Sequence, residues 1–170
     1  MKKILSFLFL GLMFVSCAQQ DNLSVAVEMI KNKQYDSAIE MFNKIASQTN
    51  DKDIKSNALY NIGLCYGLKE DYEKEIEYYK KAIEEYASCQ PALYELGMIY
   101  YKNKDLDNSL NLFEKLIEAN PEHEGAYYMV GVIQNDLGNE EVAMAAMQKS
   151  ADLDSAEAKE FLAKKQNNNQ

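Results

Sequence analysis

Apolar side chains recur along this chain at helical spacing, in segments of about a dozen residues separated by short polar turns. Three of these segments align without gaps at an offset of 34 residues. Their glycines are Gly63, Gly97 and Gly131. The alanines five positions earlier keep the same spacing: Ala58, Ala92 and Ala126. A period of this length predicts stacked units of supersecondary structure, because one helix pair cannot bury its apolar face alone.

The positions around the glycines repeat as well. Tyr66 and Tyr100 follow the first two glycines by three residues, and Tyr72 and Leu106 open the next apolar segments. The large apolar position of those segments holds Tyr79, Phe113 and Met147. Together with Pro121, this pattern resembles the tetratricopeptide repeat (TPR) family. The resemblance implies an all-α fold, a right-handed α-solenoid of TPR helix-turn-helix repeats with a C-terminal capping helix.

The alignment gives repeat boundaries. A degenerate first repeat covers residues 19–52, with Ala26 in place of the glycine, and a small insertion at residues 51–55 follows it. We predict the remaining repeats at residues 56–89, 90–123 and 124–157. Residues 156–166 are expected to form the capping helix, with Phe161 and Leu162 covering the core and Lys164 and Lys165 facing water. A disordered tail, residues 167–170, is expected to follow.

The glycines should allow the two helices of each repeat to approach closely. Ala38 and Ala143, on the second helices, are expected on the other side of this contact. Glu75 and Ser109 replace that alanine in the middle repeats. A buried unpaired carboxylate is costly, so Glu75 should reach solvent or a partner and splay its repeat slightly.

Charge excludes one class of function. The chain carries a net charge of −9, and all 18 of its basic residues are lysines. Without arginine it lacks the side chain best suited to bidentate phosphate contacts, and its acidity repels a phosphate backbone. We therefore expect no binding of nucleic acid.

The N-terminus has the organisation of a secretory signal. Lys2 and Lys3 precede an apolar run over residues 4–15, which is too short to span a bilayer as a helix. The residues up to Cys17 resemble the lipobox of bacterial lipoproteins, although Phe14 stands at the usual leucine position. The resemblance implies that residues 1–16 are removed and that Cys17 is acylated with fatty acids such as palmitate. An ordinary signal peptide that happens to contain a cysteine is the alternative.

The same resemblance implies a location. The protein is expected in the bacterial cell envelope, lipid-anchored on the periplasmic or surface side. Ala18, rather than Asp, after the cysteine favours the outer membrane by the sorting rule of some bacteria. Few residues separate Cys17 from the first predicted helix, so the repeats should lie close to the bilayer.

Candidate chemistry is sparse. His123, the single histidine, is expected in an exposed turn with no nucleophile placed beside it. Cys65 is expected in the core, and a Cys65–Cys89 disulfide is left open. Carboxylates lie at helical spacing, which is typical of solvated faces. We therefore predict no catalytic residue, no metal site, no cofactor and no small-molecule substrate.

A protein-binding groove is the better candidate. In TPR proteins the first helix of each repeat lines the inner surface, and that resemblance assigns seven residues to a groove: Tyr60, Leu64, Tyr94, Met98, Tyr101, Tyr128 and Val132. Tyrosine suits recognition because it offers a rigid face and a polar tip. The carboxylate clamp of chaperone-binding TPR proteins is absent, since Pro91 and Glu95 occupy its cationic places in the third repeat. An apolar or aromatic peptide or helix is the expected ligand.

These observations favour a membrane-tethered protein–protein interaction adaptor whose partner is an unknown protein. The alternative is a structural subunit of an envelope or outer-membrane assembly complex. A distant third is an enzyme with an unrecognised metal site.

Overall fold

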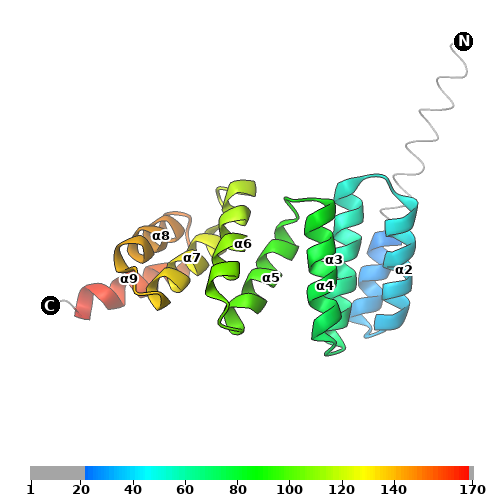
Figure 1. The fold of residues 1–170 in the computed structure, drawn as a ribbon, viewed down its shortest axis with the longest axis horizontal. Coiled ribbons are helices and arrows are strands. Elements are labelled where there is room, and N and C mark those ends of the chain that lie inside the picture. Colours follow the sequence, from blue (N-terminus) through cyan, green and yellow to red (C-terminus); the bar gives the residue numbers. More distant parts are fainter. Residues whose placement is uncertain (1–21, 169–170) are drawn as a thin grey trace, which may run out of the picture. The chain divides into compact units, whose positions relative to one another are not determined.

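The computed structural model describes residues 22–168, and in this range the chain forms helices and no strand (Figure 1). The predicted signal segment and Cys17 lie outside the described residues. The chain divides into two compact units, one ending at Ala87 and the other beginning at Ser88, called unit 1 and unit 2 below. The all-α fold of TPR helix hairpins with a C-terminal capping helix is confirmed. Within residues 22–168, every helix is too short or too polar to span a membrane.

Unit 1 contains two helix hairpins. Residues 22–31 pair with α2 (Tyr35–Gln48), and α3 (Lys52–Leu68) pairs with α4 (Tyr72–Glu85). The insertion expected at residues 51–55 is instead the start of α3. The reason is local: Asp51 caps this helix, its carboxylate accepting from the backbone N–H groups of Asp53 and Ile54.

Unit 2 contains two further hairpins and a final helix. The first hairpin joins α5 (Gln90–Lys102) to α6 (Leu106–Ala119), and the second joins α7 (Glu124–Asp136) to α8 (Glu140–Asp152). The last helix is α9 (Ala156–Asn168). This helix runs two residues beyond the predicted boundary at residue 166, so residues 167 and 168, expected in the disordered tail, are helical.

The turn inside each hairpin has one geometry. Lys33, Glu70, Lys104 and Gly138 all adopt a left-handed backbone, with φ of 59°, 62°, 62° and 81°. In the α5–α6 turn, the Lys104 N–H donates to the carbonyl of Tyr101 and the Asp105 N–H to that of Tyr100. This is the Schellman arrangement that ends helices at a left-handed residue. Glycine fits such a position best, yet only one of the four turns has it.

The repeat glycines place first and second helices in contact. A Cβ on Gly63 would lie 2.7 Å from the Tyr79 ring, one on Gly97 3.0 Å from Phe113, and one on Gly131 2.9 Å from Met147. The side chains nearest the glycines are therefore the large apolar residues, while residues at the alanine position also contact the glycine helices. Tyr79, Phe113 and Met147 are fully buried, so each glycine makes space for a core side chain.

Two polar residues at the alanine position are accommodated differently. The Ser109 hydroxyl is buried and donates to the Gly97 carbonyl over 2.8 Å. Glu75 is half-buried, and its carboxylate lies over Gly67, where an added Cβ would be 2.5 Å from Oε1. At Gly63 the Glu75 carbonyl oxygen is 3.2 Å from the added Cβ. The helices are thus close at this point, so the expected splaying of the second repeat is not found there.

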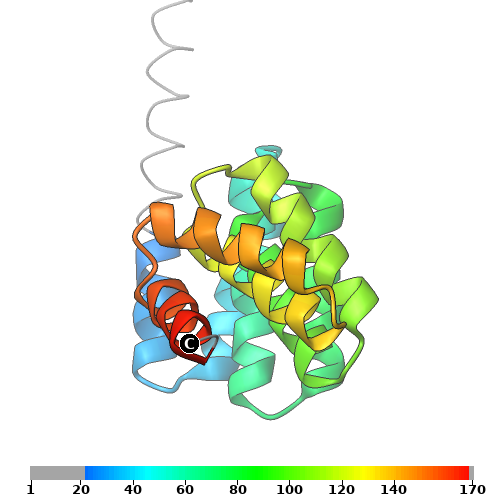
Figure 2. The same cartoon turned by 90° about the vertical axis from the view of Figure 1, so that its left-hand side faces the viewer.

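α9 closes the C-terminal end of unit 2 (Figure 2). Phe161 and Leu162 pack against a core of Met147, Ala151 and Ala158. The two lysines behave differently. Lys164 is exposed and pairs with Glu160, whereas Lys165 reaches back to Glu140 on α8 with a 2.7 Å ion pair. The apolar side of the helix covers the core, as expected of a cap.

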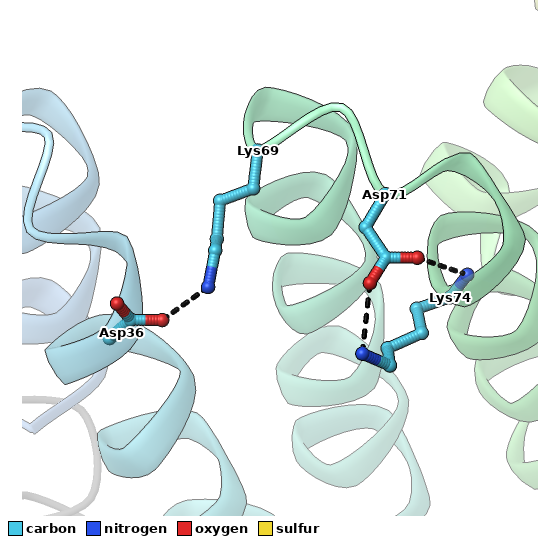
Figure 3. Close-up of polar contacts among 4 residues, drawn as sticks. All are labelled: Asp36, Lys69, Asp71 and Lys74. Carbon is cyan, nitrogen blue, oxygen red and sulfur yellow. Dashed lines mark hydrogen bonds and ion pairs between the residues drawn. The ribbon is translucent and has the colours of Figure 1, made fainter.

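Ion pairs lie at the helix ends of unit 1, between two helices and within one. In Figure 3, Lys69 at the end of α3 reaches Asp36 on α2, and Lys74 reaches Asp71, which caps α4. The Asp36 hydrogen bond is the main reason that the pKa of Lys69 is raised. Both pairs are exposed, so they orient the turns more than they stabilise the fold.

Candidate partner-binding face

The seven predicted groove residues lie on the first helices of three hairpins, and all of them are half-buried. Tyr60 and Leu64 are on α3 in unit 1; the other five are on α5 and α7 in unit 2. Partial burial leaves part of each side chain available to a partner while its base is held by the fold.

In unit 1, Tyr60 is held by an aromatic stack. Its ring lies 5.5 Å from that of the buried Tyr79 at an interplanar angle of 22°. Such offset stacking is worth about 0.5–1.5 kcal/mol beyond area burial. Tyr60 therefore supports the core as well as the predicted face.

In unit 2, Tyr94 joins α5 to the start of α7. Its ring meets Phe113 edge-on at 5.6 Å and stacks on His123 at 5.6 Å and 21°. His123 is not the exposed turn residue that the sequence suggested. It is half-buried and caps α7, with Nδ1 accepting from the Ala126 N–H over 3.2 Å.

Both burial and nearby negative charge act on the Tyr94 hydroxyl. Burial raises the pKa of Tyr94, and the negative charges of Glu95, Glu157 and Glu124 raise it further. Carboxylates at helical spacing were expected on solvated faces; Glu124 and Glu157 are exposed, whereas Glu95 is half-buried. The influence of Glu124 and Glu157 on Tyr94 depends on how α7 and α9 pack, which sequence spacing does not show.

Tyr101 makes the second link between α5 and α7. Its hydroxyl donates to Asp136 Oδ2 over 2.9 Å, while Lys104 Nζ lies 5.5 Å from its ring centroid. Burial first, and this hydrogen bond second, raise the pKa of Tyr101. The Lys104 contact shows that the ring accepts a cation.

Tyr128 and Val132 on α7 also take part in the C-terminal core of unit 2. Both pack against the cluster of Met147, Ala151 and Ala158, as Phe161 and Leu162 of α9 do. They are half-buried, like Met98 on α5. On α5 the predicted face runs from Tyr94 through Met98 to Tyr101.

Chemistry beyond this face is limited in residues 22–168. No three His, Cys, Asp or Glu side chains there gather as metal ligands would. Cys65 and Cys89 are both buried, and neither forms a disulfide with another described residue. Burial raises the pKa of Cys65 to about 11. Cys65 is thus a core residue, as the sequence predicted.

The helix hairpins, the glycine contacts and the tyrosine-bearing first helices define a TPR-type repeat protein. In agreement, residues 94–158 match the tetratricopeptide repeat profile. The chain belongs to a family described as a domain of unknown function (DUF6340), whose profile matches residues 24–118. Among curated proteins, none matches this chain.

Solved structures share the fold. A structure of MamA is 21% identical with a TM-score of 0.66, covering 83% of this chain and 81% of that one. YrrB, described as a TPR protein with an unusual peptide-binding site, is 24% identical with a TM-score of 0.62, covering 88% and 76%. A tetratricopeptide repeat protein from Parabacteroides merdae is 18% identical with a TM-score of 0.69, covering 82% and 56%. At these identities the likeness shows the fold.

Proposed function

We propose that this protein is an adaptor that binds a segment of a partner protein on the first-helix face of its TPR hairpins. The observation that carries the proposal is the row of half-buried side chains on α5, Tyr94, Met98 and Tyr101. Solenoid repeats offer extended surfaces of this kind for recognition. Tyrosine and methionine are enriched at the cores of protein interfaces, where they give a large contact area. The peptide-binding site named for YrrB supports the same use of the fold. The proposal includes no catalytic step.

Substitutions that test the proposed binding face should leave the packing of the core intact. Tyr60 and Tyr94 stack on core residues, so alanine there would disturb the fold. Met98→Ala combined with Tyr101→Ala removes half-buried contact area from one helix and one exposed hydrogen bond to Asp136, and no core aromatic stack. Tyr72→Ala is the matched control, because Tyr72 is 62% exposed and lies on the second helix α4.

The experiment is crosslinking in intact cells, followed by mass spectrometry of the captured proteins. The double variant should lose the main partner by at least about tenfold, as expected when a binding hot spot is truncated. The Tyr72 variant should capture it like the original chain. Equal capture by a folded double variant would refute the proposed face.

The proposal also includes a lipid tether at Cys17. It is supported by the apolar run and lipobox-like residues before that cysteine. One acyl chain binds a bilayer only marginally, whereas two or three hold a protein firmly. Cys17→Ala should therefore move the protein out of the membrane fraction of a bacterial host, and the intact mass of the original chain should include the lipid. Retention of the variant in washed membranes, without a lipid mass, would contradict the tether.

A structural subunit of an envelope assembly is the second candidate. It is favoured by Tyr72 in unit 1 and Val142 in unit 2, apolar side chains that are 62% and 51% exposed on the second helices α4 and α8. The native mass after detergent extraction separates the two candidates. A stable large particle supports the subunit, and a monomer supports the adaptor.

A further inference from the structure

Tyr94, on the proposed binding face, contacts two other rings of unit 2. It meets the fully buried Phe113 edge-on, with 5.6 Å between ring centroids and an interplanar angle of 79°. The ring of His123, which precedes α7, stacks on Tyr94 at 5.6 Å and 21°. A Cβ on Gly125 would lie 3.4 Å from His123 Cε1 and 3.5 Å from Tyr94 Cε2, so both rings border the first turn of α7. Tyr94 is thus fixed by the core and by the turn before α7, while it remains half-buried.

His123 makes two different contacts with one side chain. Its Nδ1 atom accepts a hydrogen bond from the Ala126 backbone N–H over 3.2 Å, which caps α7, and its ring stacks on Tyr94. Helices usually begin with Ser, Thr, Asp or Asn, because a short side chain with one oxygen is enough for the cap. One repeat earlier, Cys89 begins α5 without a side-chain cap bond. The flat imidazole ring of His123 therefore provides more than the cap requires.

We propose that His123 is a positioning residue for the binding face, and that its ring holds Tyr94 in the orientation that a partner segment contacts. The inference rests on the proposed adaptor function and adds a residue outside the seven predicted for the groove. Fixing one mobile side chain during association weakens binding by about twofold to tenfold. The stack on His123 removes this cost, because the Tyr94 ring is ordered before the partner arrives.

Two substitutions separate the cap from the stack. His123→Asn keeps a side-chain oxygen for the Ala126 N–H but removes the ring. His123→Phe keeps a flat ring for Tyr94 but has no atom that can accept the capping hydrogen bond. Asp71→Ala is the control, because Asp71 caps α4 in unit 1 by accepting from the Lys74 backbone N–H. It removes a cap of the same kind far along the chain from the proposed face.

The probe is a fluorescent twelve-residue peptide, selected on the purified full chain from a random display library. It is kept only if Met98→Ala combined with Tyr101→Ala weakens its binding by at least about tenfold. His123→Asn should weaken this peptide by about threefold to tenfold, because Tyr94 must then be ordered on binding. His123→Phe and Asp71→Ala should remain within about twofold of the original chain, although loss of a cap lowers the melting temperature of both.

NMR on the free protein gives a readout that a merely structural role would not produce. The order parameter of the ¹³C-labelled Tyr94 ring should fall in His123→Asn and be retained in His123→Phe. Protection of the Ala126 amide from hydrogen exchange should show the reverse pattern, because only the asparagine variant keeps the cap. Thermal unfolding of both variants verifies that they fold.

The outcomes separate this inference from the adaptor proposal. Unchanged affinity in His123→Asn, or a loss confined to His123→Phe, would make His123 only a cap and would overturn the inference while the adaptor proposal stands. An equal loss in Asp71→Ala would show that binding follows general stability, and would also overturn it. If no selected peptide depends on Met98 and Tyr101, the adaptor proposal and this inference both fail for linear segments.

Discussion

The Tyr101 hydroxyl donates a hydrogen bond to Asp136 Oδ2 over 2.9 Å, joining the first helices of two consecutive repeats, α5 and α7. The Asp136 charge and the donated hydrogen bond both favour the protonated phenol, which raises the pKa of Tyr101 together with burial. The contact ties a side chain of the proposed binding face to the packing of unit 2.

Asp136→Asn should lower the pKa of Tyr101, because the amide cannot repel the phenolate. The raised pKa contributes stability that is fully present below the unfolded value of about 10 and lost as pH rises through the folded pKa. The stability difference between original and variant should therefore narrow in alkaline solution. An NMR titration of ¹³C-labelled tyrosines measures the pKa, with Glu114→Gln as the control. An unchanged Tyr101 titration in the Asp136 variant would contradict the coupling.

Gly63→Ala should destabilise unit 1 more than Gly131→Ala destabilises unit 2. At Gly63 the new methyl would meet the buried Tyr79 ring and the Glu75 carbonyl, whereas at Gly131 it would meet the flexible Met147 side chain. Overpacking costs about 1–3 kcal/mol, and alanine regains up to about 1 kcal/mol of helix propensity. We expect a net loss of roughly 1–2 kcal/mol at Gly63. Thermal unfolding followed by circular dichroism provides the ranking.

Gly125→Ala is the control for that comparison. Its added methyl would have no neighbour nearer than 3.4 Å, so it should be neutral or slightly stabilising. A larger loss at Gly125 than at Gly63 would show that close approach does not explain the repeat glycines.

The left-handed position of the hairpin turns can be tested in both directions, by removing its glycine in one turn and introducing one in another. Gly138→Ala should lower the free energy of unfolding by about 1 kcal/mol, because φ at this position is 81°, in the left-handed region. An added Cβ would have no neighbour within 4 Å, so a steric clash would not contribute to the loss. Lys104→Gly should stabilise by up to about 1 kcal/mol, since glycine adopts the same φ without a Cβ penalty. Urea unfolding measures both. Changes of the opposite sign would mean that Lys104 contributes more through its side chain than its backbone costs.

Cys65 should resist thiol reagents in the folded protein. Its side chain is fully buried and its pKa is about 11, so the reactive thiolate is scarce near neutral pH. A chain carrying Cys17→Ser and Cys89→Ala isolates this thiol. Its reaction with a chromogenic disulfide should be slow at pH 8 and rapid in denaturant. Fast labelling under native conditions would show that α3 opens locally. The stability that this raised pKa contributes should be lost as pH rises from about 9 to about 11.

The sequence determined the architecture because its information is periodic. Glycines 34 residues apart and large apolar residues at a fixed distance behind them require helix hairpins that stack, and Phe161 and Leu162 already indicated a closing helix. It also predicted that Cys65 is buried. Local patterns such as these depend on neighbouring residues, so they can be read without coordinates.

Tertiary packing decided what the individual side chains do. Sequence spacing could not show that Gly67 makes space for Glu75 or that His123 stacks on Tyr94 while capping α7. Nor could it show that Tyr128 and Val132 share a core cluster with residues of α9. These relationships arise between helices, where distance depends on the packing of the intervening residues. For the same reason, the sequence could not show that Glu124 on α7 and Glu157 on α9 help to raise the pKa of Tyr94 on α5 after burial, the larger cause.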